Sequence, residues 1–375
     1  MPNLNDYLIW RGDLTLDHAP WCEVDSLAMA CLSYIKLYEA AEKPVSLRDV
    51  INPEGFDDKL INRFFTKCRA LFDQMAASER FGDMLLRDYI DILDDEGVKQ
   101  FSAVTADLPD GTCFIAFRGT DSTITGWRED FHMAFESPVP AQEEALAYLI
   151  RAAEKTARPF RLGGHSKGGN LAAYAASHAP RHVQDRILSI ACFDAPGLDD
   201  DTTAGEGYQR IRSRITSVIP EASIVGLMLN YHDDYSVVKA DAMGFLQHDA
   251  FTWQLAGPSF DRTDSVSGAS QLLDDTLHDW LQSCSPEERR AFVDMVFDLL
   301  ASTNAKSFAE MSEEKLRSLG AMLASARGLK LPTIMNFLRL VSEFMRIGAG
   351  NVIERLRGEG DKAPSDSHDD SMPEG

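Results

Sequence analysis

The chain has 375 residues, and its 59 aspartates and glutamates outnumber its 37 lysines and arginines, giving a formal net charge of −22. A surface this acidic repels nucleic-acid phosphates and anionic membranes, so we expect no nucleic-acid partner. No stretch approaches the roughly 20 apolar residues that a spanning helix needs. Met1–Asp13 also lacks the basic start and apolar run of a signal peptide. We therefore expect a cytoplasmic protein without a transmembrane segment.

The six cysteines form no Cys-x-x-Cys pair, and several lie in apolar runs such as 113–115. This pattern is typical of small buried hydrophobic side chains, and not of disulfides or metal ligands. A reducing compartment fits such usage, and no metal or organic cofactor is implied.

The first half of the chain predicts helices followed by strands. Apolar residues at helical spacing indicate a helix over Val24–Ala41, with Asp25 as its N-cap, and a second helix over Asp57–Met75. Phe101–Leu108 and Thr112–Arg118 are rich in β-forming residues and are separated by a Pro-Asp-Gly turn. We predict a β-hairpin whose second strand is buried on both faces.

Helices then alternate with strands, which predicts an α/β protein whose sheet is covered on both faces. The expected elements are a helix over Ala141–Lys155, a strand over Phe160–Gly163, a helix over Gly169–His178 and a strand over Ile187–Phe193.

Beyond about residue 264 the pattern is helical. Ser285-Pro286-Glu287-Glu288 has the capping-box pattern, Ser312 begins another helix, and Pro332–Leu356 shows a further apolar periodicity. Gly358–Gly375 is acidic and polar, which predicts a disordered tail. We expect one domain over 1–263, a helical extension or cap over 264–357 and the tail over 358–375.

The strongest motif is Gly164-His165-Ser166-Lys167-Gly168, which fits G-x-S-x-G between a predicted strand and a predicted helix. In such an elbow Ser166 is a nucleophile on a turn so sharp that side chains at positions 164 and 168 would clash, and glycine removes the clash. The alternative is a glycine-rich strand-to-helix turn without chemistry.

Further segments carry a resemblance. Phe117-Arg118-Gly119-Thr120, Trp127–Asp130 and the elbow continuing into Gly169-Asn170-Leu171-Ala172 resemble the class 3 (fungal-type) lipases. The lysine after the serine, with Asp194-Ala195-Pro196-Gly197 and Gln247-His248-Asp249, is similar to an uncharacterised bacterial family with a GHSKGGN elbow. The resemblance spans roughly Met1–Leu255. It implies an α/β-hydrolase fold: a mostly parallel sheet flanked by helices, with an N-terminal helical lead-in and a C-terminal helical extension.

Stabilising an oxyanion takes two donors. The backbone N–H of Lys167 follows the nucleophile, and Thr120 matches the lipase residue that supplies the second N–H. Arg118 and Gly119 are expected to be structural. The Lys167 side chain either pairs with a nearby carboxylate, which base rates favour, or meets an anionic substrate group.

The base is expected among nine histidines, after the acid in chain order. His18, His132, His165, His178 and His182 come too early, His278 lies in an amphipathic helix, and His368 lies in the predicted tail. Of the remaining two, His248 follows the last predicted strands and matches the family motif, and His232 is the alternative.

The acid is Asp194 by preference, because it ends a strand directly after the nucleophile helix. This placement resembles pancreatic-type lipases. Class 3 lipases place the acid one strand later, where this chain has Ser223 with Glu221 nearby, so Glu221 is the second choice and Asp233 or Asp234 the third. Asp194 could alternatively serve only to form the turn through its side chain.

These residues predict a serine hydrolase that cleaves carboxylic esters, including lipid esters, through an acyl-enzyme. The alternative is a non-catalytic protein that uses the hydrolase fold for binding or as a scaffold. Oligomeric state has no signal in the sequence.

Overall fold

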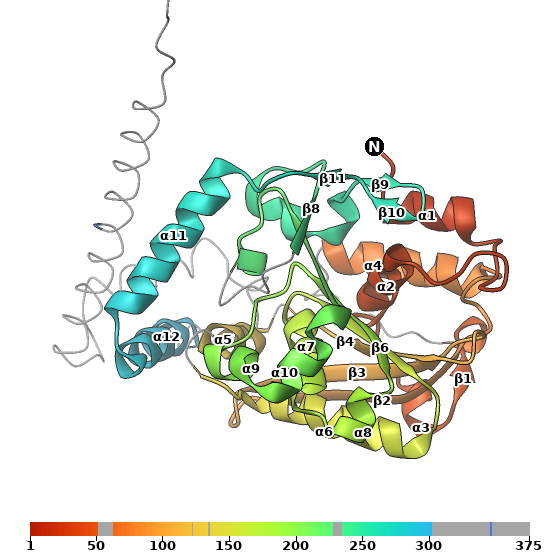
Figure 1. The fold of residues 1–375 in the computed structure, drawn as a ribbon, viewed down its shortest axis with the longest axis horizontal. Helices are drawn as coiled ribbons and strands as arrows, with labels where there is room; N and C mark the ends of the chain where they lie inside the picture. The colour runs from red at the N-terminus through yellow and green to blue at the C-terminus, as the bar shows by residue number, and fades with distance from the viewer. Residues whose placement is uncertain (52–62, 122, 134–135, 228–234, 302–345, 347–375) are drawn as a thin grey trace, which may run out of the picture.

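The computed structural model describes residues 1–51, 63–121, 123–133, 136–227, 235–301 and 346. Within these residues, nine strands form one sheet in the order β1-β2-β3-β4-β5-β6-β7-β8-β11 (Figure 1). The strands are β1 (Val45–Ser46), β2 (Leu85–Asp94), β3 (Lys99–Asp107), β4 (Cys113–Phe117), β5 (Phe160–His165), β6 (Ile187–Phe193), β7 (Ile215–Pro220), β8 (Tyr235–Val238) and β11 (Arg262–Thr263). β9 (Leu255–Ala256) and β10 (Ser259–Phe260) form a separate pair.

The sheet is mixed, which corrects the expectation of a mostly parallel one. Strands β4 to β8 pair in parallel. Strands β1 to β4 pair antiparallel, and so do β8 and β11. The antiparallel start follows from short connections such as the predicted hairpin between β3 and β4, where Asp110 accepts a hydrogen bond from the Thr112 N–H (3.0 Å) and Gly111 has φ 81°.

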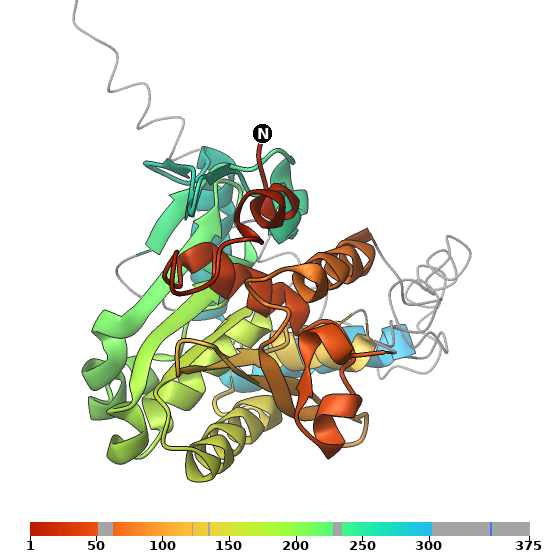
Figure 2. The ribbon, with the colours of Figure 1, turned by 90° about the vertical axis from the view of Figure 1, so that its right-hand side faces the viewer.

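Sequential parallel strands joined by right-handed crossovers place their helices on one face of a sheet. On that face lie α6 (Pro140–Lys155), α7 (Lys167–His178) and α10 (Glu206–Ile211), packed in one hydrophobic cluster with alternate residues of β4. The other alternate residues, Phe114 and Ala116, join α2 (Glu23–Leu32) and α4 (Arg63–Ala77) in a second cluster. The expectation of a sheet covered on both faces is confirmed (Figure 2).

The N-terminal helices differ from the predicted ones. The chain begins with α1 (Leu4–Arg11), and α2 ends at Leu32 rather than near residue 41, where only the short α3 (Glu39–Glu42) lies. The N-cap of α2 is Cys22, and Asp25 is the third helical residue, whose carboxylate accepts from the Cys22 N–H (2.9 Å). Asp25 also pairs with Arg80 (2.5 Å), with both side chains fully buried. Residues 57–62 of the second predicted helix lie outside the described residues, and α4 ends at Ala77.

Several elements had no sequence prediction, among them strand β2 and helix α5 (Ile124–His132). Strand β2 carries charged residues that form ion pairs, such as Asp91 with Arg118 (2.9 Å), and its register shifts between Arg87 and Ile90. Helix α5 begins with Thr123 as N-cap, whose hydroxyl accepts from the Gly126 N–H. The short helices α8 (Arg181–Gln184) and α9 (Asp200–Ala204) complete the connections between parallel strands.

After β11 come α11 (Gly268–Ser283) and α12 (Pro286–Ala301). The predicted capping box of α12 is confirmed: the Ser285 N–H donates to the Glu288 carboxylate (3.0 Å) and the Glu288 N–H to the Ser285 hydroxyl (3.2 Å). Helix α12 lies against α5, where Asp294 binds Arg128 (2.6 Å) (Figure 1). The helices predicted from Ser312 and over 332–356, and the tail, lie outside the described residues. No helix within the described ranges is long and apolar enough to cross a membrane.

Candidate active site

Ser166 lies at a sharp turn between β5 and α7. Its φ of 58° and ψ of −135° are backbone angles that non-glycine residues rarely adopt. The turn closes because residues 164 and 168 are glycines: a Cβ on Gly164 would lie 2.3 Å from the carbonyl carbon of Gly168, and one on Gly168 would lie 2.1 Å from the Phe117 oxygen. The sequence thus folds here into the strand–turn–helix geometry that the motif requires.

Asp194 and His248 lie in direct contact. Asp194 follows the last residue of β6, and its Oδ2 lies 2.6 Å from Nδ1 of His248, which ends the 3₁₀ helix Gly244–His248. His165 and Phe193 are paired across β5 and β6, so the next residues, Ser166 and Asp194, project from adjacent strand ends. The Asp194 side chain is 1% exposed, and that of His248 is 19% exposed.

The second oxygen of Asp194 is held by the loop after β7. Its Oδ1 accepts from the Ser223 hydroxyl (2.5 Å) and from the Gly226 N–H (3.1 Å). A Cβ on Gly226 would lie 2.4 Å from this oxygen, so only glycine allows the loop to approach. With Nδ1 of His248 on the other oxygen, the carboxylate is hydrogen-bonded on both sides.

The alternative site residues take other places. The backbone of Glu221 bonds to Val238 and Ser267, but its carboxylate has no hydrogen bond or ion pair with the residues that the structure describes. Ser223, where class 3 lipases have their acid, is instead a donor to Asp194. The alternative base His232 and the third-choice acids Asp233 and Asp234 lie outside the described residues.

The loop after β4 lies beside the elbow. A Cβ on Gly119 would lie 2.5 Å from the His165 oxygen, so the loop backbone contacts the elbow backbone. Arg118 is buried and pairs with Asp91 (2.9 Å) and Asp121 (3.5 Å), which anchors the loop as expected. The Thr120 hydroxyl donates to Asp130.

The Lys167 side chain is buried in an ion pair, in agreement with the favoured interpretation. Its Nζ donates to the Glu129 carboxylate (3.0 Å) and the Gln100 carbonyl (3.0 Å), and lies 3.4 Å from Asp130. Burial alone would lower the pKa of Lys167, but the two carboxylates outweigh it, and the pKa is raised. Burial raises the pKa of Asp130 to about 6, although Lys167 and Thr120 oppose the shift. The ammonium group therefore stays charged below the elbow.

Sequence analysis missed two partners of the site, Ser223 as donor to Asp194 and Tyr34 beside the elbow. In the sequence, Ser223 stands out only as a departure from the class 3 pattern. Tyr34 lies in a segment predicted as helix, and its contact with position 165 spans 131 residues, which no local signal encodes.

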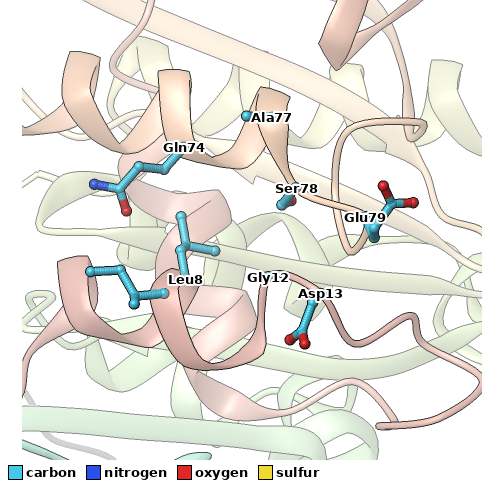
Figure 3. A pocket seen from close by; sticks show the side chains of 8 residues that line it. Leu8, Gly12, Asp13, Gln74, Ala77, Ser78 and Glu79 are labelled. Atoms are coloured by element: carbon cyan, nitrogen blue, oxygen red, sulfur yellow. The ribbon is translucent and has the colours of Figure 1, made fainter.

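All six cysteines are free, and five are buried, as predicted. Among the described residues no group of three or more His, Cys, Asp or Glu side chains could hold a metal ion. A surface pocket of about 350 Å³ lies between α1 and the end of α4 (Figure 3), far along the chain from the elbow, and contains none of the predicted site residues.

The fold is that of an α/β protein, a mixed sheet with helices on both faces. Residues 75–298 match the Mbeg1-like family, and the chain belongs to that family. Among solved structures it is similar to M37 lipase (16% identity, TM-score 0.38, covering 56% of this chain and 70% of that one). It is also similar to the native Rhizomucor miehei lipase propeptide complex (16% identity, TM-score 0.35, covering 58% and 68%). No curated protein matches the sequence.

Proposed function

We propose that the protein is a serine hydrolase of the α/β-hydrolase fold that cleaves carboxylic esters with Ser166, His248 and Asp194. The contact between Asp194 and His248 (2.6 Å) carries the proposal, because it joins residues 54 positions apart beside a strained serine turn. A carboxylate bonded to Nδ1 leaves Nε2 of the imidazole as a proton acceptor and stabilises the imidazolium once it forms.

The reaction then runs in two steps. Nε2 of His248 takes the Ser166 proton while the serine oxygen attacks the ester carbonyl. The N–H groups of Lys167 and Thr120 donate to the resulting oxyanion, and Lys167 is suited to this because the first N–H groups of a helix lack intrahelical acceptors. The C–O bond breaks, and the alcohol leaves with the proton from His248. Water, deprotonated by His248, then cleaves the acyl-enzyme and releases the acid.

The surroundings support an ester with an apolar part. Met243 and Leu246 precede His248 in the same segment and are 85% and 70% exposed, so the segment that carries the base presents apolar side chains to solvent. We propose a lipid or other apolar ester as substrate.

Helices α11 and α12 belong to the proposed 264–357 extension. Helix α12 contacts α5, and α5 carries Glu129, the ion-pair partner of Lys167 in the elbow. Six free cysteines support action in a reducing compartment such as the cytoplasm.

The test is hydrolysis of p-nitrophenyl esters with acyl chains of two to twelve carbons, a series chosen as roughly spanning soluble to lipid-like substrates. We expect activity in the wild type, near-complete loss in Ser166→Ala and His248→Ala, and a large loss in Asp194→Asn, with Glu221→Gln as the carboxylate control. A folded wild type without activity on any ester of the series would favour the non-catalytic binding or scaffold role.

A further inference from the structure

His165, within the elbow, lies buried against the segment that carries His248. Its Nε2 is 2.8 Å from the backbone carbonyl of His248, and its Nδ1 is 3.1 Å from the Tyr34 hydroxyl. A carbonyl only accepts, so Nε2 carries the hydrogen. In a neutral imidazole Nδ1 is then the acceptor, and the Tyr34 hydroxyl donates to it. These contacts assign one tautomer to His165.

The surroundings keep His165 neutral. Burial is the main cause that lowers its pKa, to about 3, and His248 lowers it further, while Asp194 opposes the shift. Among the residues that the structure describes, Tyr34, His248 and Asp194 are the titratable groups that contact His165 or act on its charge. Neutrality matters because the two imidazole rings are 4.6 Å apart, and a charged His165 would repel the His248 imidazolium that the proposed reaction forms.

The residue before His248, Gln247, is also held through its backbone carbonyl by the N–H of an aromatic ring. Nε1 of the buried Trp253 donates to the Gln247 carbonyl (2.7 Å), so the carbonyls of residues 247 and 248 each receive one hydrogen bond from an aromatic ring. The Gln247 side chain also bonds to the Ala222 N–H (2.7 Å), beside the loop that holds Asp194. Phe64 stacks on His165 with ring centroids 5.5 Å apart, which restrains the imidazole. The backbone on which His248 rests is therefore fixed from several sides.

We propose that His165 is a positioning residue that holds the backbone of His248 through its Nε2–H, and that Tyr34 selects the tautomer that makes this possible. The inference rests on the proposed function. Under this proposal His165, which precedes the nucleophile in sequence, positions the base and does not contact the substrate.

The kinetic test compares His165→Phe, which keeps an aromatic ring but removes both nitrogens, with His165→Gln, whose amide N–H can replace the Nε2 donor. We expect kcat for an ester to fall on the order of 10- to 100-fold in His165→Phe with KM little changed, because misplacing a catalytic group by about 1 Å has such an effect. His165→Gln should recover part of the loss. Equal kcat in His165→Phe and the wild type would overturn the proposal.

Tyr34→Phe is the second variant, and Tyr148→Phe is its matched control. Tyr148 is also buried, and its hydroxyl makes a hydrogen bond to Thr105 (2.8 Å) on the other face of the sheet. We expect kcat to fall in Tyr34→Phe and not in Tyr148→Phe. An equal fall in both would overturn a specific role for Tyr34.

Nitrogen-15 NMR of labelled histidines tests the arrangement independently of activity. We expect His165 to be the neutral Nε2–H form and to remain neutral on acidification to about pH 5, whereas Tyr34→Phe should weaken the tautomer preference. An Nδ1–H or charged His165 in the wild type would overturn the positioning proposal even if the enzyme is active. An inactive wild type with the expected tautomer would overturn the proposed function instead.

Discussion

Replacing Lys167 by methionine tests whether its ammonium group is a buried structural charge. The variant keeps an unbranched side chain of similar length but leaves the Glu129 carboxylate, 1% exposed, without its cation. Breaking a buried pair from one side costs about 3–5 kcal/mol, since an uncompensated charge remains inside.

The structure places the expected loss at the lower end of that range. Glu129 keeps two backbone donors, the N–H groups of Gln100 (3.0 Å) and Ala141 (2.9 Å), so its charge is still partly compensated. We therefore expect Lys167→Met to lower the free energy of unfolding by about 3 kcal/mol. Adding Glu129→Gln removes the unpaired charge, and the double variant should recover part of the loss.

The assay is urea unfolding followed by circular dichroism. Lys239→Met is the matched control, because the Lys239–Asp261 pair has a similar length (3.0 Å) but 43% and 37% exposed side chains, and should change stability by less than about 1 kcal/mol. The reasoning is refuted if Lys167→Met is no less stable than Lys239→Met. If Lys167→Met is instead as stable as Lys239→Met but hydrolyses only anionic esters more slowly, the role of Lys167 would be to bind an anionic group of the substrate.

Three further predictions concern the acid, the elbow and pH. Ser223→Ala removes one donor to the Asp194 carboxylate, and should lower kcat about 10-fold in ester assays; an unchanged kcat would contradict the role of that bond. Gly168→Ala forces a Cβ to within 2.1 Å of the Phe117 oxygen and should lower the melting temperature and abolish activity, so a normal melting curve would contradict the close packing of the elbow. Because burial raises the pKa of Asp130 from 3.8 to about 6, ionising it weakens the fold: its stabilising contribution is complete below about pH 4 and is lost as the pH rises to 6. The free energy of unfolding of the wild type minus that of Asp130→Asn, measured by urea unfolding across that range, should therefore fall as the pH rises. A difference that does not change with pH would contradict the shift in pKa.

The strands and helices around the elbow could be predicted because their signals are local. Strand β6 begins and ends where expected, and β5 extends only two residues further than predicted. The need for glycine at positions 164 and 168 could also be predicted, because it depends only on the space available within one turn. Strand β2 was not predicted because its charged residues find partners in distant elements, as Asp91 does in Arg118.

The contacts of the site depend on the sheet, which brings distant segments together. The order of catalytic residues along the chain led to Asp194 and His248 as candidates, but nothing in the sequence indicates that Ser223 bonds to Asp194 or that His165 bonds to the His248 carbonyl. Helix α2 was predicted too long because residues 33–38 are also apolar at helical spacing, yet tertiary packing turns the chain there and directs Tyr34 toward His165.

Covalent labelling by a fluorophosphonate probe tests the central claim most directly, because the probe reacts with a serine only where a base activates it. After treatment of the full chain and digestion, mass spectrometry of the peptides should place the adduct on Ser166, and Ser166→Ala should take up no probe. A folded wild type that remains unlabelled, or an adduct at another residue that persists in Ser166→Ala, would contradict the account.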